Sequence, residues 1–133
     1  MCLTKVKVVR TLRRNKTVYK AVRVSAGGQI TTAVHGYPLK LGLNTDLRTE
    51  PLSARYDTKY PAGFHFYTKR LPCHTWTGTH IAVCRIPAGT IITEGEEVVW
   101  LHSIKFYPVI VTPTFNLLKL EELKGANPNK ERK

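Results

Sequence analysis

Acidic residues are scarce in this chain, and its first 24 residues contain none. Nine Asp and Glu stand against 21 Lys and Arg, which leaves a formal net charge of +12. Long apolar runs are also missing: none approaches the roughly 20 residues of a membrane-spanning helix, so we expect no membrane partner. Because Lys7 and Arg10 interrupt the N-terminal valines, we expect no secretory signal either.

Cysteines are few. Cys2, Cys73 and Cys84 cannot all pair within one chain, and an odd count favours reduced thiols in a cytosol over a disulfide scaffold. We therefore expect a cytoplasmic location. The candidate metal ligands are Cys73, His74, His80 and Cys84, but they lack the close-spaced pairs typical of structural zinc, so we expect no metal site. The apolar neighbours of Cys84 predict a buried, inert thiol.

The length of 133 residues suits one domain with its own core. Several short runs of β-forming residues are separated by Gly and Pro, which is typical of an antiparallel sheet. We expect a single α+β domain over residues 1–124, built on a twisted and mostly antiparallel sheet. Residues 125–133 form a basic tail that we expect to be disordered.

A C-terminal helix is the predicted helical element of this fold. Thr114 can serve as its N-cap, and the helix would run from Phe115 to Leu123. Phe115 and Leu118 fall on one stripe, which Leu117 and Leu120 widen into an apolar face. We expect this face to close one side of the sheet.

Strands are predicted along the rest of the chain. The β-rich runs 6–9 and 18–24 flank the basic stretch 11–16 and together predict a hairpin with a basic loop. In the run 63–68, alternation places Phe64 and Phe66 on one face and His65 and Tyr67 on the other. Further strands are expected over residues 29–34, 80–86, 90–93 and 98–111, with a bend or hairpin between the second and third of these.

Positive charge is concentrated at the N-terminus. The first 24 residues carry eight basic side chains: Lys5, Lys7, Arg10, Arg13, Arg14, Lys16, Lys20 and Arg23. Such clustering indicates an anionic partner, because it exceeds what solubility alone requires. The alternative is that the charge only solubilises the chain and protects an edge strand from aggregation.

Basic and aromatic residues together suit a phosphate-bearing ligand. Guanidinium groups chelate phosphate oxygens, and aromatic rings stack on bases. For any single Tyr, the simpler explanation is a half-buried strand residue with a solvated hydroxyl. The candidate ligand-binding residues are Arg13, Arg14, Lys20, Arg23, His65, Tyr67, Lys69, Arg70 and Trp76.

Two enzymatic alternatives use other residues. Lys20 on an early strand, His65 and Tyr67 in mid-chain and a late glutamate follow the order seen in ADP-ribosyltransferase-like folds, although the signature residues of those enzymes are not matched. The late glutamate would be Glu94, Glu96 or Glu97, and three glutamates around one glycine are more simply a solvated turn. Removal of Met1 would expose Cys2 as an N-terminal nucleophile, for which no oxyanion partner can be named.

Four short motifs carry a resemblance to a known group. They are Met1-Cys2-Leu3, Val18-Tyr19-Lys20, Gly63-Phe64-His65 and Ile86-Pro87-Ala88-Gly89-Thr90. On these motifs the chain resembles a group of small uncharacterised proteins of phages and prophages. The resemblance implies a viral accessory or counter-defence protein acting in the host bacterial cytoplasm, and it implies no catalytic residues.

The sequence therefore predicts a binding protein without catalytic residues or cofactor. Its expected ligand is a nucleotide, such as a signal of bacterial antiphage defence that the protein would sequester. The alternatives are a protein that binds single-stranded nucleic acid and an ADP-ribosyltransferase-like enzyme. The sequence does not distinguish a small nucleotide from a polymer.

Overall fold

The structure is a computed structural model that describes residues 3–33, 36–46, 51–53, 59–70, 78–100 and 104–122. This part of the chain consists of strands and their connections and contains no helix. The strands are β1 Lys5–Thr11, β2 Lys16–Val24, β3 Ile30–Thr32, β4 Pro38–Leu39, β5 Gly42–Thr45, β6 Leu52–Ser53, β7 Lys59–Tyr60, β8 Phe64–Tyr67, β9 His80–Ile86, β10 Ile91–Trp100, β11 Ile104–Thr112 and β12 Thr114–Glu122.

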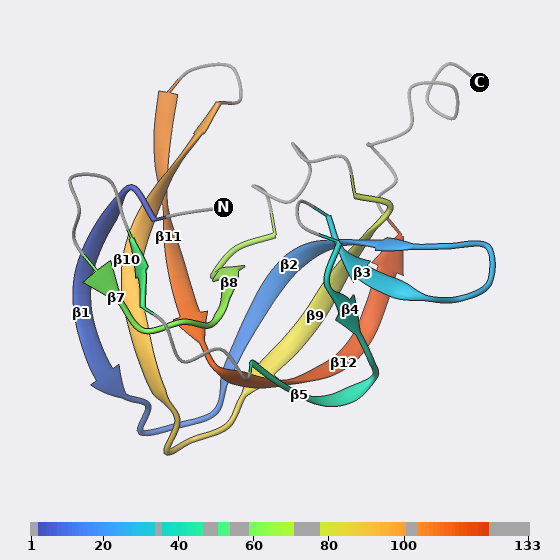
Figure 1. The fold of residues 1–133 in the computed structure, drawn as a ribbon. Helices are drawn as coiled ribbons and strands as arrows, with labels where there is room; N and C mark the ends of the chain where they lie inside the picture. The colour runs from blue at the N-terminus through green and yellow to red at the C-terminus, as the bar shows by residue number, and fades with distance from the viewer. Residues whose placement is uncertain are drawn as a thin grey trace.

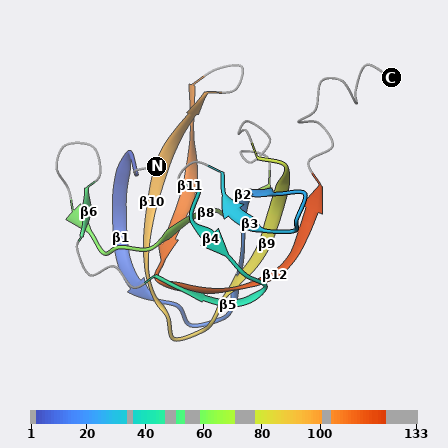
Figure 2. The ribbon, with the colours of Figure 1, turned by 45° about the vertical axis from the view of Figure 1, so that its right-hand side comes forward.

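Ten of these strands form one antiparallel sheet (Figure 1). Its main path runs β1-β10-β11-β8-β2-β9-β12-β5, and β3 and β4 extend it beside β2. The pair β6-β7 is separate and lies to one side of the main sheet (Figure 2). In the described ranges, no helix is long and apolar enough to cross a membrane.

The predicted α+β class is wrong, and so is the predicted C-terminal helix. Residues 114–122 form β12, which pairs with β5 and β9. Phe115 and Leu117 are buried on one face as a strand requires, but the register to β9 shifts between Leu117 and Lys119. This bulge places an extra residue, Leu118, between them. The extra residue breaks the alternation, so the leucine spacing looked helical.

The predicted basic hairpin is also wrong, because β1 and β2 do not pair with each other. Instead β1 pairs with β10 and β2 pairs with β9. Thr11 lies opposite Ile91 and Lys16 opposite Ile86, so one register continues through both pairs of strands. The two chain segments therefore form a single long ribbon that bends in the middle (Figure 1, lower left).

Two backbone hydrogen bonds and one to a side chain hold the two bends of this ribbon together. The N–H of Leu12 donates to the carbonyl of Thr90 at 2.9 Å, and the N–H of Gly89 donates back to the carbonyl of Leu12 at 2.8 Å. The N–H of Ala88 donates to Oδ1 of Asn15 at 2.8 Å. Gly89 has a φ of 89°, which an L side chain rarely adopts, so glycine suits this turn.

Other strand predictions are confirmed. Strands form at Ile30–Thr32, Phe64–Tyr67 and His80–Ile86, within the predicted ranges. The predicted run 98–111 is divided instead between β10 and β11, which pair as neighbours with Trp100 opposite Ile104. The predicted tail, residues 125–133, lies outside the described residues.

Apolar side chains pack on both faces of the sheet. One cluster includes Val18, Val22, Phe66, Ile110 and Phe115, and its members come from strands in both halves of the sheet. The other cluster lies on the opposite face and contains Tyr60, Tyr67, Val109 and Val111. Since the central strands are covered on both sides, their sequences read as nearly continuous apolar runs. Cys84 belongs to the first cluster and is buried, as predicted.

Candidate functional site

The bend between β1 and β2 presents exposed positive charge. Arg13 and Arg14 are exposed between the two strands, and Lys16 follows as the first residue of β2. Leu12 is only 5% exposed and packs in the core. This buried anchor and the hydrogen bonds to residues 88–90 hold the backbone from which the arginines project.

Glutamates neutralise four cations elsewhere on the sheet. Arg10 Nη2 lies 2.7 Å from Glu94 Oε1, and Lys7 Nζ lies 3.6 Å from Glu96 Oε1. The hydrogen bond from Arg10 lowers the pKa of Glu94 below its ordinary value. Glu121 is the acidic partner of two further cations, Arg70 and Lys119, at 3.0 and 3.4 Å.

The bend has no such acidic partner among the described residues. Arg13 and Arg14 form no ion pair there, and neither does Arg85, which is exposed on β9 opposite Thr17. Exposed arginines without a carboxylate are available to an outside anion, because no intramolecular contact must be broken first. These three residues define what we call the bend cations. The sequence prediction included the first two and missed Arg85.

Lys20, His65 and Tyr67 do not face this surface. Lys20 Nζ donates to the carbonyl of His65 at 2.8 Å and lies 5.6 Å from the centre of the Phe66 ring. His65 and Tyr67 are both more than nine-tenths buried. Tyr67 is a strand residue, as the simpler explanation of the tyrosines expects, but it is buried instead of half-buried, and its hydroxyl donates to Glu97 instead of contacting solvent. The burial of both rings removes them from contact with a ligand at the surface.

The remaining predicted cations lie toward the other end of β2. Arg70 pairs with Glu121, which stands in register with Ala21 across β9. Ala21 lies about 16 Å along β2 from Lys16, the first residue after the bend. The Arg70 guanidinium also lies over the Tyr19 ring, 4.6 Å from its centre. Lys69 and Arg23 are exposed. The predicted residues are therefore divided between separate regions, and Trp76 lies outside the described residues.

A buried polar cluster lies on the face opposite Phe66. Tyr67 Oη donates to Glu97 Oε1 at 3.1 Å, and Tyr60 Oη lies 2.9 Å from His65 Nε2. Glu97 is 5% exposed, and its other oxygen, Oε2, has no hydrogen-bond partner among the described residues. Burial raises the pKa of Glu97 to about 7, and the hydrogen bond from Tyr67 opposes this shift.

The same cluster bears on the enzymatic alternative. Glu97 belongs to this cluster, whereas Glu94 and Glu96 lie on the other face of β10 and form surface ion pairs. His65, Tyr67 and Glu97 do share a face, as that alternative requires, but all three are more than nine-tenths buried. A substrate would therefore reach them only after local opening of the sheet.

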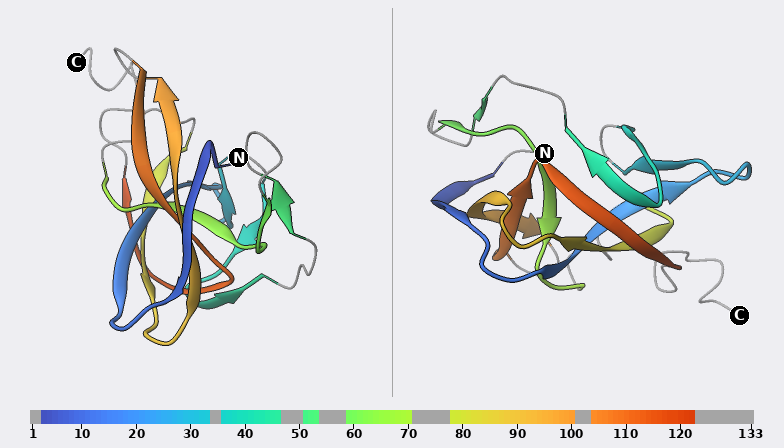
Figure 3. Two further views of the ribbon diagram at one scale, coloured as in Figure 1. Left: turned by 90° about the vertical axis from the view of Figure 1, so that its left-hand side faces the viewer. Right: turned by 90° about the horizontal axis from the view of Figure 1, so that it is seen from below.

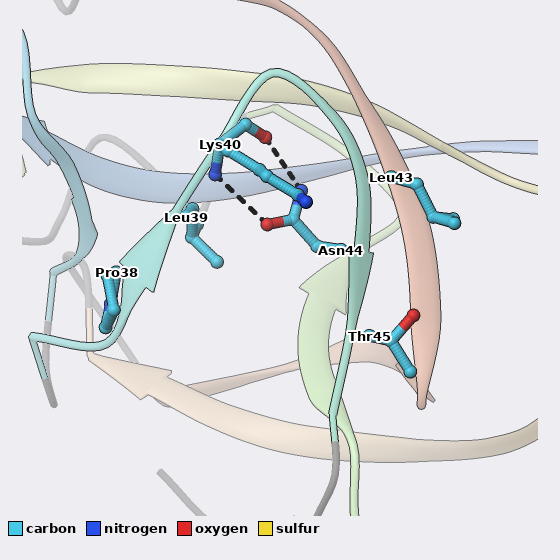
Figure 4. A pocket seen from close by; sticks show the side chains of 6 residues that line it. All are labelled: Pro38, Leu39, Lys40, Leu43, Asn44 and Thr45. Atoms are coloured by element: carbon cyan, nitrogen blue, oxygen red, sulfur yellow. Dashed lines mark hydrogen bonds between the residues drawn. The ribbon is translucent and has the colours of Figure 1, made fainter.

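An open hollow of about 450 Å³ lies beside the β4–β5 turn (Figure 4). Asn44 is buried there and closes the turn: its Oδ1 accepts from the N–H of Lys40 at 3.1 Å, and its Nδ2 donates to the carbonyl of Lys40 at 2.8 Å. The amide is thus used within the turn. The remaining wall is largely apolar, from Pro38, Leu39 and Leu43, and the sequence patterns did not predict this hollow.

Comparisons with protein-family models, with curated proteins and with solved structures found no match to this chain. The resemblance to phage and prophage proteins therefore stays a prediction from its four motifs.

Proposed function

We propose that the protein binds a phosphate-bearing ligand at the bend of the long ribbon, without chemical change of the ligand. The observation that carries this proposal is that, among the described residues, the cations of the bend lack the carboxylate partners that other cations of the sheet have. Glu94, Glu96 and Glu121 pair with cations elsewhere, while the bend cations Arg13, Arg14 and Arg85 have no acidic partner in the described part of the chain.

The geometry of the bend supports contact through arginine side chains. The N–H groups of Ala88 and Gly89 already donate within the bend, so they are not available to hold a phosphate. Guanidinium groups make charge-assisted, bidentate contacts with phosphate oxygens, and each such hydrogen bond contributes about 1.5 to 3 kcal/mol. A backbone that is already held in place loses little conformational entropy when the ligand binds.

A nucleotide signal is the ligand we favour, and sequestration is the role. A small protein can sequester such a signal with tight phosphate contacts alone, and this role fits the phage context that the sequence resemblance implies. Single-stranded nucleic acid is the second candidate. It is favoured by the open, exposed position of the bend cations, which allows a polymer backbone to pass across them.

The test is a double substitution with a matched control. Arg13→Ala/Arg14→Ala removes two charges from the bend, whereas Lys7→Ala/Lys119→Ala removes two charges that are paired with glutamates. We expect the first variant to bind nucleoside triphosphates or oligonucleotides at least tenfold more weakly and the second to bind within about twofold of the wild type. Equal losses in both variants would show that only net charge matters, and no loss in the first would refute the proposal.

A further inference from the structure

The outer edge of β1 has no pairing partner among the described strands. The main path of the sheet begins with β1, whose pairing partner is β10 on one side, and Figure 3 shows β1 at the rim of the sheet. All its residues are exposed except Val6, which is half-buried. An edge strand that is exposed on both faces can accept another strand.

The hydrogen bonds of Leu12 identify the backbone groups that point outward. Leu12 directs both its N–H and its carbonyl inward, to Thr90 and Gly89. Because these directions alternate along an antiparallel strand, Arg10 and Val8 also point toward β10. The N–H and carbonyl groups of Val9 and Thr11 therefore lie on the free edge, where they can pair with an extended chain.

The two faces beside this edge differ in chemistry. On one face, Lys7 and Arg10 form half-exposed ion pairs with glutamates of β10, and the exposed Lys5 adds a positive charge that forms no ion pair in the described structure. Val8 is 42% exposed on the same face. On the other face, Val9 and Ile91 are 47% and 59% exposed. An added strand would meet a face with a net positive charge with one set of its side chains and a face of aliphatic groups with the alternate set.

Charge at the ends of the edge argues against a second copy of this chain as the occupant. Lys5 at one end forms no ion pair in the described structure, and Arg13 and Arg14 follow the other end. Antiparallel pairing of two β1 strands would place the positive end of one against the positive end of the other. Like charges opposite each other destabilise such a pair, whereas an acidic segment is attracted at both ends.

We propose that the free edge of β1 binds an extended segment of a partner protein by strand addition. In this segment, acidic side chains alternate with aliphatic ones. The acidic side chains lie on the face of Lys5, Lys7 and Arg10, where three cations face two glutamates, and the aliphatic ones lie beside Val9 and Ile91. Main-chain hydrogen bonds to Val9 and Thr11 supply affinity, and the alternation supplies specificity.

The test uses a fluorescent synthetic peptide in which Glu alternates with Val, titrated with the full chain and measured by anisotropy. Val9→Pro removes one outward donor and keeps the inward ladder to β10, and proline is tolerated on a free edge. Val9→Ile keeps the donor and the aliphatic side chain. We expect at least tenfold weaker binding for Val9→Pro and a change within about twofold for Val9→Ile.

A second measurement uses the wild-type chain and does not depend on folding of the proline variant. The peptide is N-methylated on alternate residues, in the two possible registers. The register whose donors face β1 should lose binding, and the other should keep it. Equal binding of both methylated peptides, or of a peptide in which Lys alternates with Val, would overturn the proposal. So would concentration-dependent dimerisation abolished by Val9→Pro, because the edge would then serve a second copy.

Discussion

At the scale of single residues, burial separates glutamates that look equivalent in the sequence. Glu94 and Glu96 form surface ion pairs, which contribute little to stability. Glu97 occupies the buried face, accepts from Tyr67 and leaves Oε2 without a partner in the described region. The direction in which each side chain points along β10 decides this difference.

The raised pKa of Glu97 predicts a loss of stability with rising pH. Its pKa is about 7 in the folded protein and 4.5 as the ordinary value. The folded state therefore favours the protonated form, and stability is fully present below pH 4.5 and falls as the pH rises through 7. The loss amounts to about 3 kcal/mol. We expect chemical denaturation of the wild type at pH 4.5 and at pH 8 to show this fall.

Glu97→Gln supplies the control, because Gln keeps an acceptor for Tyr67 but does not ionise. The free energy of unfolding of the variant should not show the fall of about 3 kcal/mol between pH 4.5 and pH 8. The unpaired amide of Gln lowers stability by the same amount at both pH values, so it does not affect this comparison. If wild type and variant change equally between the two pH values, Glu97 does not carry the effect.

The bend cations give a second prediction at this scale. Arg13 and Arg14 are exposed, and such substitutions normally change stability by no more than about 0.5 kcal/mol. The melting temperature of Arg13→Ala/Arg14→Ala should therefore hardly move while ligand affinity falls. A large fall in melting temperature would instead identify these arginines as structural, which differential scanning calorimetry would detect.

At the scale of elements, bends and bulges shape the sheet. The long ribbon of β1–β2 and β9–β10 bends where Leu12 and residues 87–90 meet, and β11 continues into β12 through Pro113. A second bulge, between Val6 and Val8, lies opposite Gly95 and Glu94. These irregularities let the same strands contribute to both halves of the sheet.

Gly95 predicts how closely β1 and β10 pack. A Cβ at this position would overlap the carbonyl oxygen of Lys5 and lie 2.8 Å from Cδ1 of Leu3. Since the first of these atoms is backbone, Gly95→Ala should displace β1 and destabilise the fold by about 1 to 3 kcal/mol. Urea denaturation measures the change.

Gly27→Ala is the matched control for this prediction. A Cβ at Gly27 would meet only Ser25 Oγ at 3.9 Å, and no unusual φ is required there. This substitution should be neutral or stabilise the fold by up to about 1 kcal/mol, because alanine restricts the unfolded chain. Similar losses at both positions would contradict the proposed close contact between β1 and β10.

At the scale of the whole molecule, charge governs association. The formal net charge of +12 creates a field that attracts any polyanion. Specific binding must therefore be separated from this general attraction, and the dependence of affinity on salt makes that separation possible.

Salt dependence should distinguish the two candidate ligands. For a single-stranded nucleic acid, log K should fall with log salt by roughly 0.7 per phosphate contacted, so contacts to the bend cations give a slope of about 2. A small nucleotide should show a shallower slope. Filter-binding or calorimetric titrations at several salt concentrations give the value, and failure to retain either ligand at physiological salt would refute the proposed function.

The sequence by itself determined the charge, the location of most strands and the burial of Cys84. These follow from composition and from local alternation, as in Phe64–Tyr67, where successive side chains must point to opposite faces. It could also indicate Arg13 and Arg14, because charge clustering is visible along the chain.

Only the tertiary structure decided which strands pair and which charges are neutralised. The β-rich runs around the basic stretch are close in sequence, so a hairpin looked natural, yet each finds its partner far along the chain, in β10 and β9. The bulge at Leu118 hid a strand behind a helical spacing, since one extra residue shifts every later side chain to the other face. For the same reason, the acidic partner of Arg70 and the exposed neighbour Arg85 could not be found from local sequence: such contacts depend on long-range pairing.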